Sequence, residues 1–356
     1  MSLVFSKPPD SICVLRMSAI GDVCHTLPVI RAIQRHWPQT KITWIIGKLE
    51  TELIGDIDDF EFIVFNKSSG WPELRKLRRT LKHRRFDLLL NMQASMRANL
   101  VSLNIRAKNK LGFDRARARD YQWLFCNSQI AAKENQHVLD GLVGFAQALG
   151  VEVNSLVWDI PVPPSAEAFA RSILPGTQST LIVSPCSSNR YRNWRNWSVE
   201  GYAEVINYAL DNLNMRCVLT GGPSETEIEY GKRVTALTGG RAQNLIGNTS
   251  LKELFALIQR STILVSPDSG PAHMATSAGT AVLGLYVTSN PLRTGPYLNL
   301  DQVVNKYPQA ISAEFGADAN NVRWGQRVRN PQAMDMIKPS EVSRQLEKML
   351  GDTVKD

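Results

Sequence analysis

Compact apolar runs alternate with amphipathic stretches along the first half of the chain. The runs at 12–15, 42–46, 62–65 and 86–90 are short and mostly apolar, which is typical of parallel strands buried on both faces. Between the last two runs, residues 74–81 place leucines at helical spacing. Strands that alternate with helices predict an α/β fold with helices covering a parallel sheet.

The alternation restarts after the segment 159–164, which has the sequence Asp-Ile-Pro-Val-Pro-Pro. Because proline breaks both helix and strand and stiffens a connection, this segment is the best linker candidate in the chain. The later apolar runs are at 181–183, 217–219, 263–265 and 282–286, and a final helix is predicted at 339–350. We therefore predict two α/β domains, 1–165 and 166–335, and a C-terminal segment, 336–356.

The charge balance narrows the class of partner. The chain carries a formal net charge of +8, which favours anionic ligands such as nucleic acid, acidic lipid or a phosphorylated substrate. Its five cysteines are scattered and none forms a CxxC pair, so we expect free thiols in a reducing compartment. No apolar run approaches the ~18 residues that a membrane-spanning helix needs. We expect a cytoplasmic protein whose contact with a membrane is peripheral.

One stretch in the second half predicts an anion-binding site. After a buried strand, a helix is expected to begin at Pro271, because proline lacks the N–H that would be unpaired there. Ser269 and Gly270 then leave backbone amides at the positive end of the helix, where phosphate binds well. The same turn carries one carboxylate, Asp268, and one imidazole, His273.

The turn after the first apolar run is a second candidate site. In a doubly wound sheet this loop lies at the carboxyl edge, where ligands bind. Gly21 allows close approach of the backbone, and Asp22 is expected at the start of the following helix. Asp22 can equally be a simple helix cap, which is a common position for aspartate. His25 belongs to the same motif.

The loop at 187–197 combines hydroxyl groups with arginines between a predicted strand and a predicted helix. A guanidinium matches phosphate geometry with two hydrogen bonds, so this loop is a candidate phosphate-binding loop. The alternative is a solvated loop with packed tryptophans. The candidate residues are Ser187, Ser188, Arg190, Arg192 and Arg195.

Several familiar ligand motifs are absent or incomplete. The glycines after the first run do not form GxGxxG, which counts against a dehydrogenase, and Gly221-Gly222 lacks the GK[ST] ending of a P-loop. Asp56 and Asp58 form a DxD pair of the kind that can hold Mg²⁺, but their stretch is acidic and irregular and is interpreted as solvated surface. No His, Cys and Asp cluster has zinc spacing, so no metal site is predicted.

Two basic stretches lie in the first domain. Residues 75–85 cover most of the surface of a predicted helix, and residues 106–119, broken by Gly112, are interpreted as a loop. A charged run is usually a solvated face, but two in one domain suggest a second anionic ligand. Nucleic acid is the weaker candidate because both stretches contain few of the aromatic residues that stack on bases.

Together, the two turns resemble the heptosyltransferases of lipopolysaccharide core assembly, glycosyltransferase family 9. The resemblance is carried by residues 16–28, RMSAIGDVCHTLP, and 267–275, PDSGPAHMA, and covers most of the chain. It implies a GT-B fold, with two Rossmann-like domains facing a central cleft. The last helix of this fold usually crosses back, so 336–356 is expected to pack on the first domain. The sequence of the loop at 187–197 is most similar to that of the heptosyltransferase I group.

The resemblance also implies roles for individual residues. Asp22 falls on the family's proposed general base and Glu225 on its adenosine-contacting glutamate. In the loop at 187–197 the family has a lysine, and this sequence has arginine instead. Arg195, Arg190 and Arg192 are the alternatives for the position of that lysine. The implied donor-binding residues are Ser187, Ser188, Arg195, Glu225, Asp268, Ser269, Gly270 and His273. The expected acceptor-binding residues are Gly21, His25, Arg75, Arg78, Arg79, Arg115 and Arg117.

The substrates that the resemblance implies are ADP-L-glycero-D-manno-heptose as donor and Kdo-lipid A, or a growing core saccharide, as acceptor. The expected reaction is an inverting, metal-independent transfer without a cofactor, in which ADP-heptose is a substrate and ADP a product. We expect peripheral contact with the cytoplasmic face of the inner membrane and no nucleic-acid partner. The alternatives are a heptosyltransferase II- or III-type enzyme with another core acceptor, another GT-B enzyme with a different nucleotide sugar, and a non-enzymatic nucleic-acid-binding protein.

Overall fold

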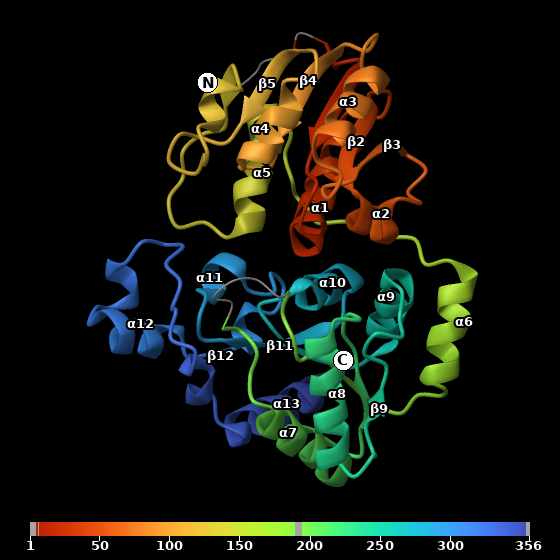
Figure 1. Cartoon of the computed structure of the whole chain (residues 1–356), viewed down its shortest axis with the longest axis vertical. Coiled ribbons are helices and arrows are strands. Elements are labelled where there is room, and N and C mark those ends of the chain that lie inside the picture. The colour runs from red at the N-terminus through yellow and green to blue at the C-terminus, as the bar shows by residue number, and fades with distance from the viewer. Residues whose placement is uncertain (1–4, 6, 189–193, 354–356) are drawn as a thin grey trace. The chain divides into compact units, whose positions relative to one another are not determined.

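The structure, a computed structural model, describes residue 5 and residues 7–188 and 194–353. The chain divides into two compact units, Met1–Pro161 and Val162–Asp356, and the division falls within the proline-rich segment 159–164. Each unit contains one six-stranded sheet in which every paired strand is parallel. Figure 1 shows the elements of both units.

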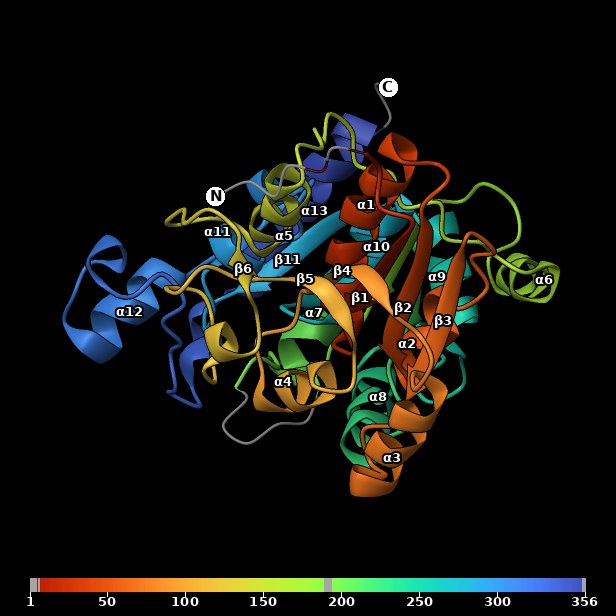
Figure 2. The ribbon, with the colours of Figure 1, turned by 90° about the horizontal axis from the view of Figure 1, so that it is seen from above.

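The first unit is built on the sheet β3-β2-β1-β4-β5-β6. Its strands are β1 (Ser11–Leu15), β2 (Lys41–Gly47), β3 (Phe60–Phe65), β4 (Phe86–Asn91), β5 (Ala107–Gly112) and β6 (Ser128–Gln129). Its helices are α1 (Ile20–His36), α2 (Lys48–Ile54), α3 (Gly70–Thr80), α4 (Met96–Ser102), the short 3-10 helix η1 (Gln122–Leu124) and α5 (Val138–Ala148). Figure 2 shows α1 and α5 on one face of this sheet and α3 and α4 on the other.

Apolar side chains on both faces of the central strands explain these layers. Cys13 and Leu89 pack with Leu77 of the α3 segment and Val101 of α4 in one buried cluster. The leucine spacing at 74–81 therefore predicted the buried side of α3 correctly, with Leu77 and Leu81 in the core. On the opposite face, α1 packs against α5.

The second unit repeats this plan with the sheet β12-β11-β10-β7-β8-β9. Its strands are β7 (Thr180–Val183), β8 (Arg216–Leu219), β9 (Gln243–Asn244), β10 (Ile263–Pro267), β11 (Ala281–Tyr286) and β12 (Val304–Asn305). Its α-helices are α6 (Pro164–Ile173), α7 (Val199–Asn212), α8 (Glu225–Leu237), α9 (Leu251–Arg260), α10 (Gly270–Ala278), α11 (Pro291–Thr294), α12 (Tyr307–Phe315) and α13 (Pro339–Thr353). Its 3-10 helices are η2 (Leu300–Gln302), η3 (Ala319–Asn321) and η4 (Ala333–Met336).

In both units the strand order reverses beside the first strand. The reversal lies between β1 and β4 in the first sheet and between β7 and β10 in the second. In open parallel sheets, ligands bind outside the carboxyl ends of the strands at this switch point. The two orders are those of doubly wound Rossmann folds, so the predicted α/β architecture with two Rossmann-like domains is confirmed.

Helix α13 packs within the second unit, where Val342, Leu346 and Met349 are buried in the core. There α13 packs against α7 and β11, and Tyr208 on α7 donates a hydrogen bond to Glu347 at 3.3 Å. The second unit itself supplies the apolar surface that these side chains need. That the segment 336–356 also packs on the first domain remains a prediction.

The basic stretch at 106–119 differs from its interpretation as a loop, because β5 occupies its first half. Pairing with β4 along its length satisfies the backbone of this strand, while Lys108 is exposed at its start. Tertiary pairing thus overrides the polar local sequence. None of the helices in the described part of the chain is long and apolar enough to cross a membrane.

Candidate functional site

Two loops meet at the switch point of the first sheet. One follows β1 and the other follows β4, and their hydrogen bonds join them directly. Arg16 donates to the backbone carbonyl of Met92, and the N–H of Met17 donates to the side-chain oxygen of Gln93 at 2.7 Å. The amide of Gln93 in turn donates to the hydroxyl of Ser18 at 3.3 Å. The turn that precedes α1 is therefore held by the neighbouring loop at the ligand-binding edge.

Asp22 projects from the first turn of α1 at this edge. One carboxylate oxygen accepts the backbone N–H of Ala19 at 2.8 Å, and the other lies 2.5 Å from a guanidinium nitrogen of Arg16. The side chain of Asp22 is 36% exposed, whereas that of Arg16 is only 9% exposed. Asp22 is the third residue of α1 and accepts the N–H of the N-cap residue Ala19, and it also presents an oriented, accessible carboxylate, so a role at the helix start and a role at a ligand site are compatible.

Gly21 and His25 lie inside the first unit. Both are buried in α1. The ring of His25 packs edge-to-face on that of His137, with centroids 5.3 Å apart, and His137 caps α5 by accepting the N–H of Leu139 at 3.0 Å. His25 thus contributes to the packing of α1 on α5, and the structure does not expose it as it exposes Asp22.

The arginines expected to bind the acceptor fall into two groups. Arg75, Arg78 and Arg79 are exposed on α3. Arg115 is also exposed, with its guanidinium 5.1 Å from the ring centroid of Trp123. Arg117 is different, because structural contacts already engage its guanidinium.

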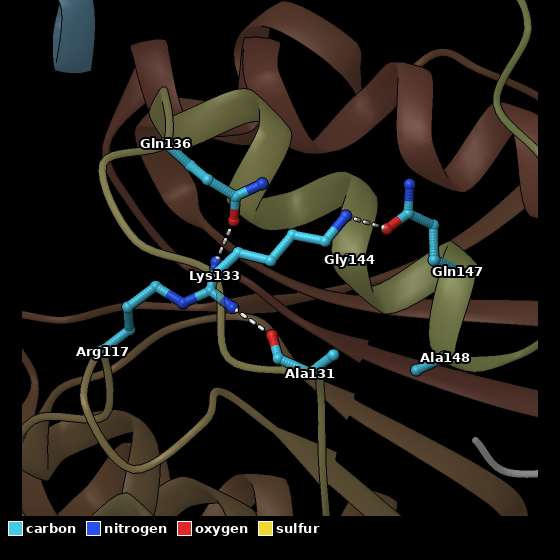
Figure 3. A pocket seen from close by; sticks show the side chains of 7 residues that line it. All are labelled: Arg117, Ala131, Lys133, Gln136, Gly144, Gln147 and Ala148. Carbon is cyan, nitrogen blue, oxygen red and sulfur yellow. Dashed lines mark hydrogen bonds between the residues drawn. The ribbon is translucent and has the colours of Figure 1, made fainter. Parts of the chain in front are cut away.

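Arg117 lies at a small pocket in the first unit, with a volume of about 130 Å³ (Figure 3). Its guanidinium pairs with Asp114, donates to the side chain of Gln136 at 2.6 Å and donates to the carbonyl of Ala131 at 2.7 Å. Lys133, on the same pocket, donates to Gln147 at 3.3 Å. A ligand would have to replace these contacts, so the local geometry makes Arg117 a residue that fixes the loop after β5.

At the switch point of the second sheet, the loop after β7 is organised by Asn196. Its side-chain oxygen accepts both the N–H and the hydroxyl of Ser187, at 2.8 and 3.0 Å. Ser187 is buried and Ser188 is exposed. Two other candidates in this loop, Arg190 and Arg192, lie outside the described residues.

Asp268 follows β10 and is the centre of a buried ionic cluster. One of its carboxylate oxygens lies 3.1 Å from Arg195 and 3.1 Å from Arg327, and it accepts the hydroxyl of Ser289 at 2.8 Å. Arg195 also donates to the backbone carbonyl of Asp268 at 2.5 Å. Burial alone raises the pKa of Asp268, but the charges of the two arginines, with that of His273, hold its pKa below the ordinary value. Asp268 is thus an ionised acceptor that orients the arginines through one of its two carboxylate oxygens.

Helix α10 begins immediately after this cluster. Ser269 is its N-cap residue, but the Ser269 hydroxyl pairs with that of Ser266 at 2.6 Å and does not cap the helix. Pro271 is the second residue of α10, which begins one residue earlier than predicted, and His273 is buried one turn into the helix. The positive end of α10 therefore lies beside two guanidinium groups, which is an arrangement suited to an anion.

The glutamate that contacts the turn after β8 is Glu227, whereas Glu225 is exposed at the first position of α8. Glu227 accepts the N–H of Gly222 at 2.6 Å and the hydroxyl of Ser224 at 3.0 Å. The spacing Ser-x-x-Glu from Ser224 is a local signal for this arrangement.

Sequence reasoning did not find Arg327 and Ser289 at Asp268. They have no local signal, because they reach Asp268 only through the fold.

Within residues 7–188 and 194–353, no group of three or more His, Cys, Asp or Glu side chains is arranged to hold a metal ion.

Comparisons with known proteins agree on one family. The model of glycosyltransferase family 9 (heptosyltransferase) matches residues 74–322. The chain is 41% identical over 346 residues to the lipopolysaccharide core heptosyltransferase OpsX of Haemophilus influenzae, covering 97% of this chain and 99% of that protein. A family 9 glycosyl transferase from Veillonella parvula has a TM-score of 0.77 at 21% identity, covering 96% and 97% of the two chains. The Escherichia coli heptosyltransferase WaaC with ADP has a TM-score of 0.73 at 18% identity, covering 95% and 99%.

Proposed function

The chain belongs to glycosyltransferase family 9, the heptosyltransferases, and we propose that it transfers L-glycero-D-manno-heptose from ADP-heptose to Kdo-lipid A during synthesis of the lipopolysaccharide inner core. The family is the one that the two turns predicted. The observation that carries the proposal is the accessible, oriented carboxylate of Asp22 at the switch point of the first sheet. The similarity to a core heptosyltransferase along nearly the whole chain supports the substrate class.

The second unit binds the donor in this proposal. Arg195 and the amides at the start of α10 stabilise the diphosphate, because a guanidinium and a positive helix end both favour negative charge. Asp268 holds Arg195 in place through its carboxylate and its backbone carbonyl. Ser187, Ser188, Glu225 and His273 complete the proposed donor-binding set. The solved structure of WaaC with ADP supports an adenine nucleotide as the donor's nucleotide.

Asp22 carries the chemistry. Its carboxylate accepts the proton of an acceptor hydroxyl as that hydroxyl attacks the anomeric carbon of the heptose. The bond between the anomeric carbon and the phosphate oxygen breaks with inversion, and its electron pair leaves with ADP. Arg16 and the N–H of Ala19 fix the carboxylate for this step, so that orientation contributes as well as basicity.

The negative charge that develops on the departing phosphate is met by fixed positive groups in this proposal. Arg195 and the positive end of α10 are in place before the reaction begins. Stabilising the departing phosphate therefore costs no reorganisation during the transfer. We expect the reaction to need neither a divalent metal ion nor a cofactor. Full loss of transfer in EDTA, with recovery when Mg²⁺ is added, would contradict this part of the proposal.

The first unit binds the acceptor, which is a glycolipid with several phosphates and carboxylates. The exposed Arg75, Arg78 and Arg79 on α3 and Arg115 give this unit free positive surface. Such residues attract anionic headgroups at a membrane surface. The protein accordingly works at the cytoplasmic face of the inner membrane, in peripheral contact with it.

Two measurements test the proposal together. In a thermal-shift screen of ADP, UDP, GDP and a short oligonucleotide, ADP alone should raise the melting temperature, because only a ligand of the folded state stabilises it. Transfer from ADP-heptose is then measured on Kdo-lipid A, with and without phosphorylation of Kdo, and on a heptosylated core. Transfer to the heptosylated core alone would assign a later step, and stabilisation by UDP or GDP would assign a different donor.

A further inference from the structure

Arg327 reaches the donor-side cluster from a distant part of the chain. It lies between η3 and η4, and its guanidinium meets the carboxylate of Asp268 at 3.1 Å. Two hydrogen bonds hold the backbone of this segment in place. The N–H of Val328 donates to the carbonyl of Thr288 at 3.1 Å, and the hydroxyl of Tyr307 donates to the carbonyl of Gln326 at 3.0 Å. The position of Arg327 beside the carboxyl end of β10 is therefore set by the fold.

The charges of this cluster do not balance. One buried carboxylate faces two guanidinium groups, so the three side chains together carry a surplus positive charge. Arg195 alone, with a side chain only 14% exposed, neutralises the charge of Asp268. A second guanidinium is not needed to compensate the carboxylate, and its charge remains for another anion.

Arg327 also keeps hydrogen-bond donors available. A guanidinium has five N–H donors, and the side chain of Arg327 makes one hydrogen bond in the described part of the chain, to Asp268. The side chain is 33% exposed, in contrast to the 7% of Asp268. The carboxylate thus fixes one corner of the guanidinium of a side chain that is one-third exposed.

The guanidinium of Arg327 lies next to the positive end of a helix. Asp268, which it contacts, immediately precedes the N-cap residue of α10, and the Ser269 side chain leaves that helix uncapped. Helix end and arginine therefore act on the same small region of space with the same sign of charge. Two independent sources of positive potential at one point are the signature of a phosphate site.

We propose that Arg327 binds a phosphate oxygen of the donor diphosphate, and that Asp268 holds its guanidinium in place for that contact. The inference rests on the proposed donor and adds a residue from the C-terminal third of the chain to its binding site. Arg327 and Arg195, which both contact the Asp268 carboxylate, then bind the same diphosphate. As the sugar leaves, Arg327 stabilises the charge that develops on ADP.

The test compares binding of ADP, AMP and adenosine to the full-length wild type, Arg327→Gln and Arg327→Lys by calorimetry. Arg327→Gln should weaken ADP binding by about 10- to 100-fold, the range for loss of a charge-assisted hydrogen bond, and leave adenosine binding unchanged. Arg327→Lys should retain part of the ADP affinity that Arg327→Gln loses, because lysine keeps the positive charge but lacks the paired N–H donors of the guanidinium. Arg323→Gln is the matched control, since Arg323 is exposed in the same segment and its loss should leave all three affinities unchanged.

Melting temperatures of the variants separate binding from folding. Equal ADP affinity in wild type and Arg327→Gln would overturn the proposal, as would an equal loss of ADP and adenosine binding. Inorganic pyrophosphate serves as a second probe that does not depend on the nucleotide. If wild type fails to bind ADP, the proposed donor is wrong. The pyrophosphate titration still decides the role of Arg327, because weaker binding in Arg327→Gln supports it and equal behaviour refutes it.

Discussion

The guanidinium of Arg16 lies 2.5 Å from the carboxylate of Asp22 and donates at the same time to the backbone carbonyl of Met92. One side chain thereby joins the end of β1, the end of β4 and the start of α1. The buried arginine fixes the direction of a carboxylate that is itself one-third exposed. This relationship turns a helix-capping aspartate into a candidate base, and it shapes the first prediction.

Asp22→Asn should reduce transfer by about 10²- to 10⁴-fold, the usual contribution of a general base, and leave the affinity for ADP unchanged. The amide keeps the size of the side chain and an oxygen that can accept the N–H of Ala19, but it cannot take a proton. Like Asp22→Ala, Asp22→Asn removes the charge that pairs with the buried Arg16, so the melting temperature of the variant is measured beside its activity. Steady-state transfer rates and calorimetry with ADP measure the two effects separately.

Asp59→Asn is a control for the first prediction, since Asp59 also pairs with an arginine, Arg31, at 2.6 Å but on exposed surface. Its transfer rate should match that of the wild type. Undiminished transfer by Asp22→Asn would remove Asp22 from the mechanism.

Glu50→Ala should destabilise the first unit by about 1 to 3 kcal/mol, because it leaves a partly buried ammonium group without its carboxylate. Lys67 lies 2.9 Å from Glu50 and donates to the carbonyl of Met17 at 3.1 Å. The Glu50 side chain is 3% exposed and that of Lys67 28%. Because Met17 stands in the turn before α1, transfer should also slow at temperatures where the variant is folded.

Urea denaturation monitors the stability of Glu50→Ala. Glu52→Ala, an exposed change on the same helix, should alter the free energy of unfolding by no more than about 0.5 kcal/mol. Equal stability of the two variants would show that the Lys67–Glu50 pair does not support this turn.

Asp268→Asn should lower the free energy of unfolding at neutral pH by about 3 to 5 kcal/mol, the cost of breaking a buried ion pair. Although burial raises the pKa of Asp268, the charges of Arg195 and Arg327 lower it below the ordinary value of 3.8. A depressed pKa stabilises the folded state fully above the ordinary pKa and progressively less as pH falls below it. The stability difference between wild type and variant should therefore be constant from neutral pH to about pH 5 and shrink in more acidic solution.

Chemical denaturation between pH 3 and pH 7, at intervals of about one pH unit across this range, checks the Asp268 prediction. A difference that grows with acidity would mean that Asp268 is protonated in the folded protein at higher pH than its ion pairs allow.

Replacing Arg75, Arg78 and Arg79 together by glutamine should raise the KM for the glycolipid acceptor and flatten its salt dependence, because exposed charges act through a screened field. The KM for ADP-heptose and the stability should remain close to those of the wild type, since these side chains lie exposed on α3. Acceptor titrations at low and high salt measure the effect.

Arg117→Gln provides the contrast for the α3 arginines. Its guanidinium joins Asp114, Gln136 and the carbonyl of Ala131, so its loss should lower stability more than it changes the acceptor KM. An unchanged acceptor KM in the triple variant, or a selective KM effect in Arg117→Gln, would reverse the assignment of the two groups.

Local patterns predicted the features that depend on neighbouring residues. The short apolar runs indicated the central strands because a parallel strand must be apolar on both faces, and Pro271 marked the start of α10. The capping position of Asp22 followed in the same way from the turn that precedes it. For these residues the physical cause lies within a few positions of the chain.

Long-range contacts lay beyond such reasoning. Strand β5 forms in a basic stretch because β4 offers it a pairing edge, and α13 finds its apolar partner surface within the second unit. Both outcomes depend on a surface made by residues far away in the chain, which no local pattern of polar and apolar positions encodes.

The sequence by itself determined the α/β class, the two turns that carry the family resemblance and the presence of a carboxylate in each. Only the tertiary structure decided what each carboxylate does. Asp22 accepts the N–H of the nearby Ala19 and is oriented by the buried Arg16, and it stays accessible. Asp268 contacts Arg195, Ser289 and Arg327, which are separated from it by 73, 21 and 59 positions. The electrostatic environment of a side chain is a sum over its neighbours in space, and folding chooses those neighbours.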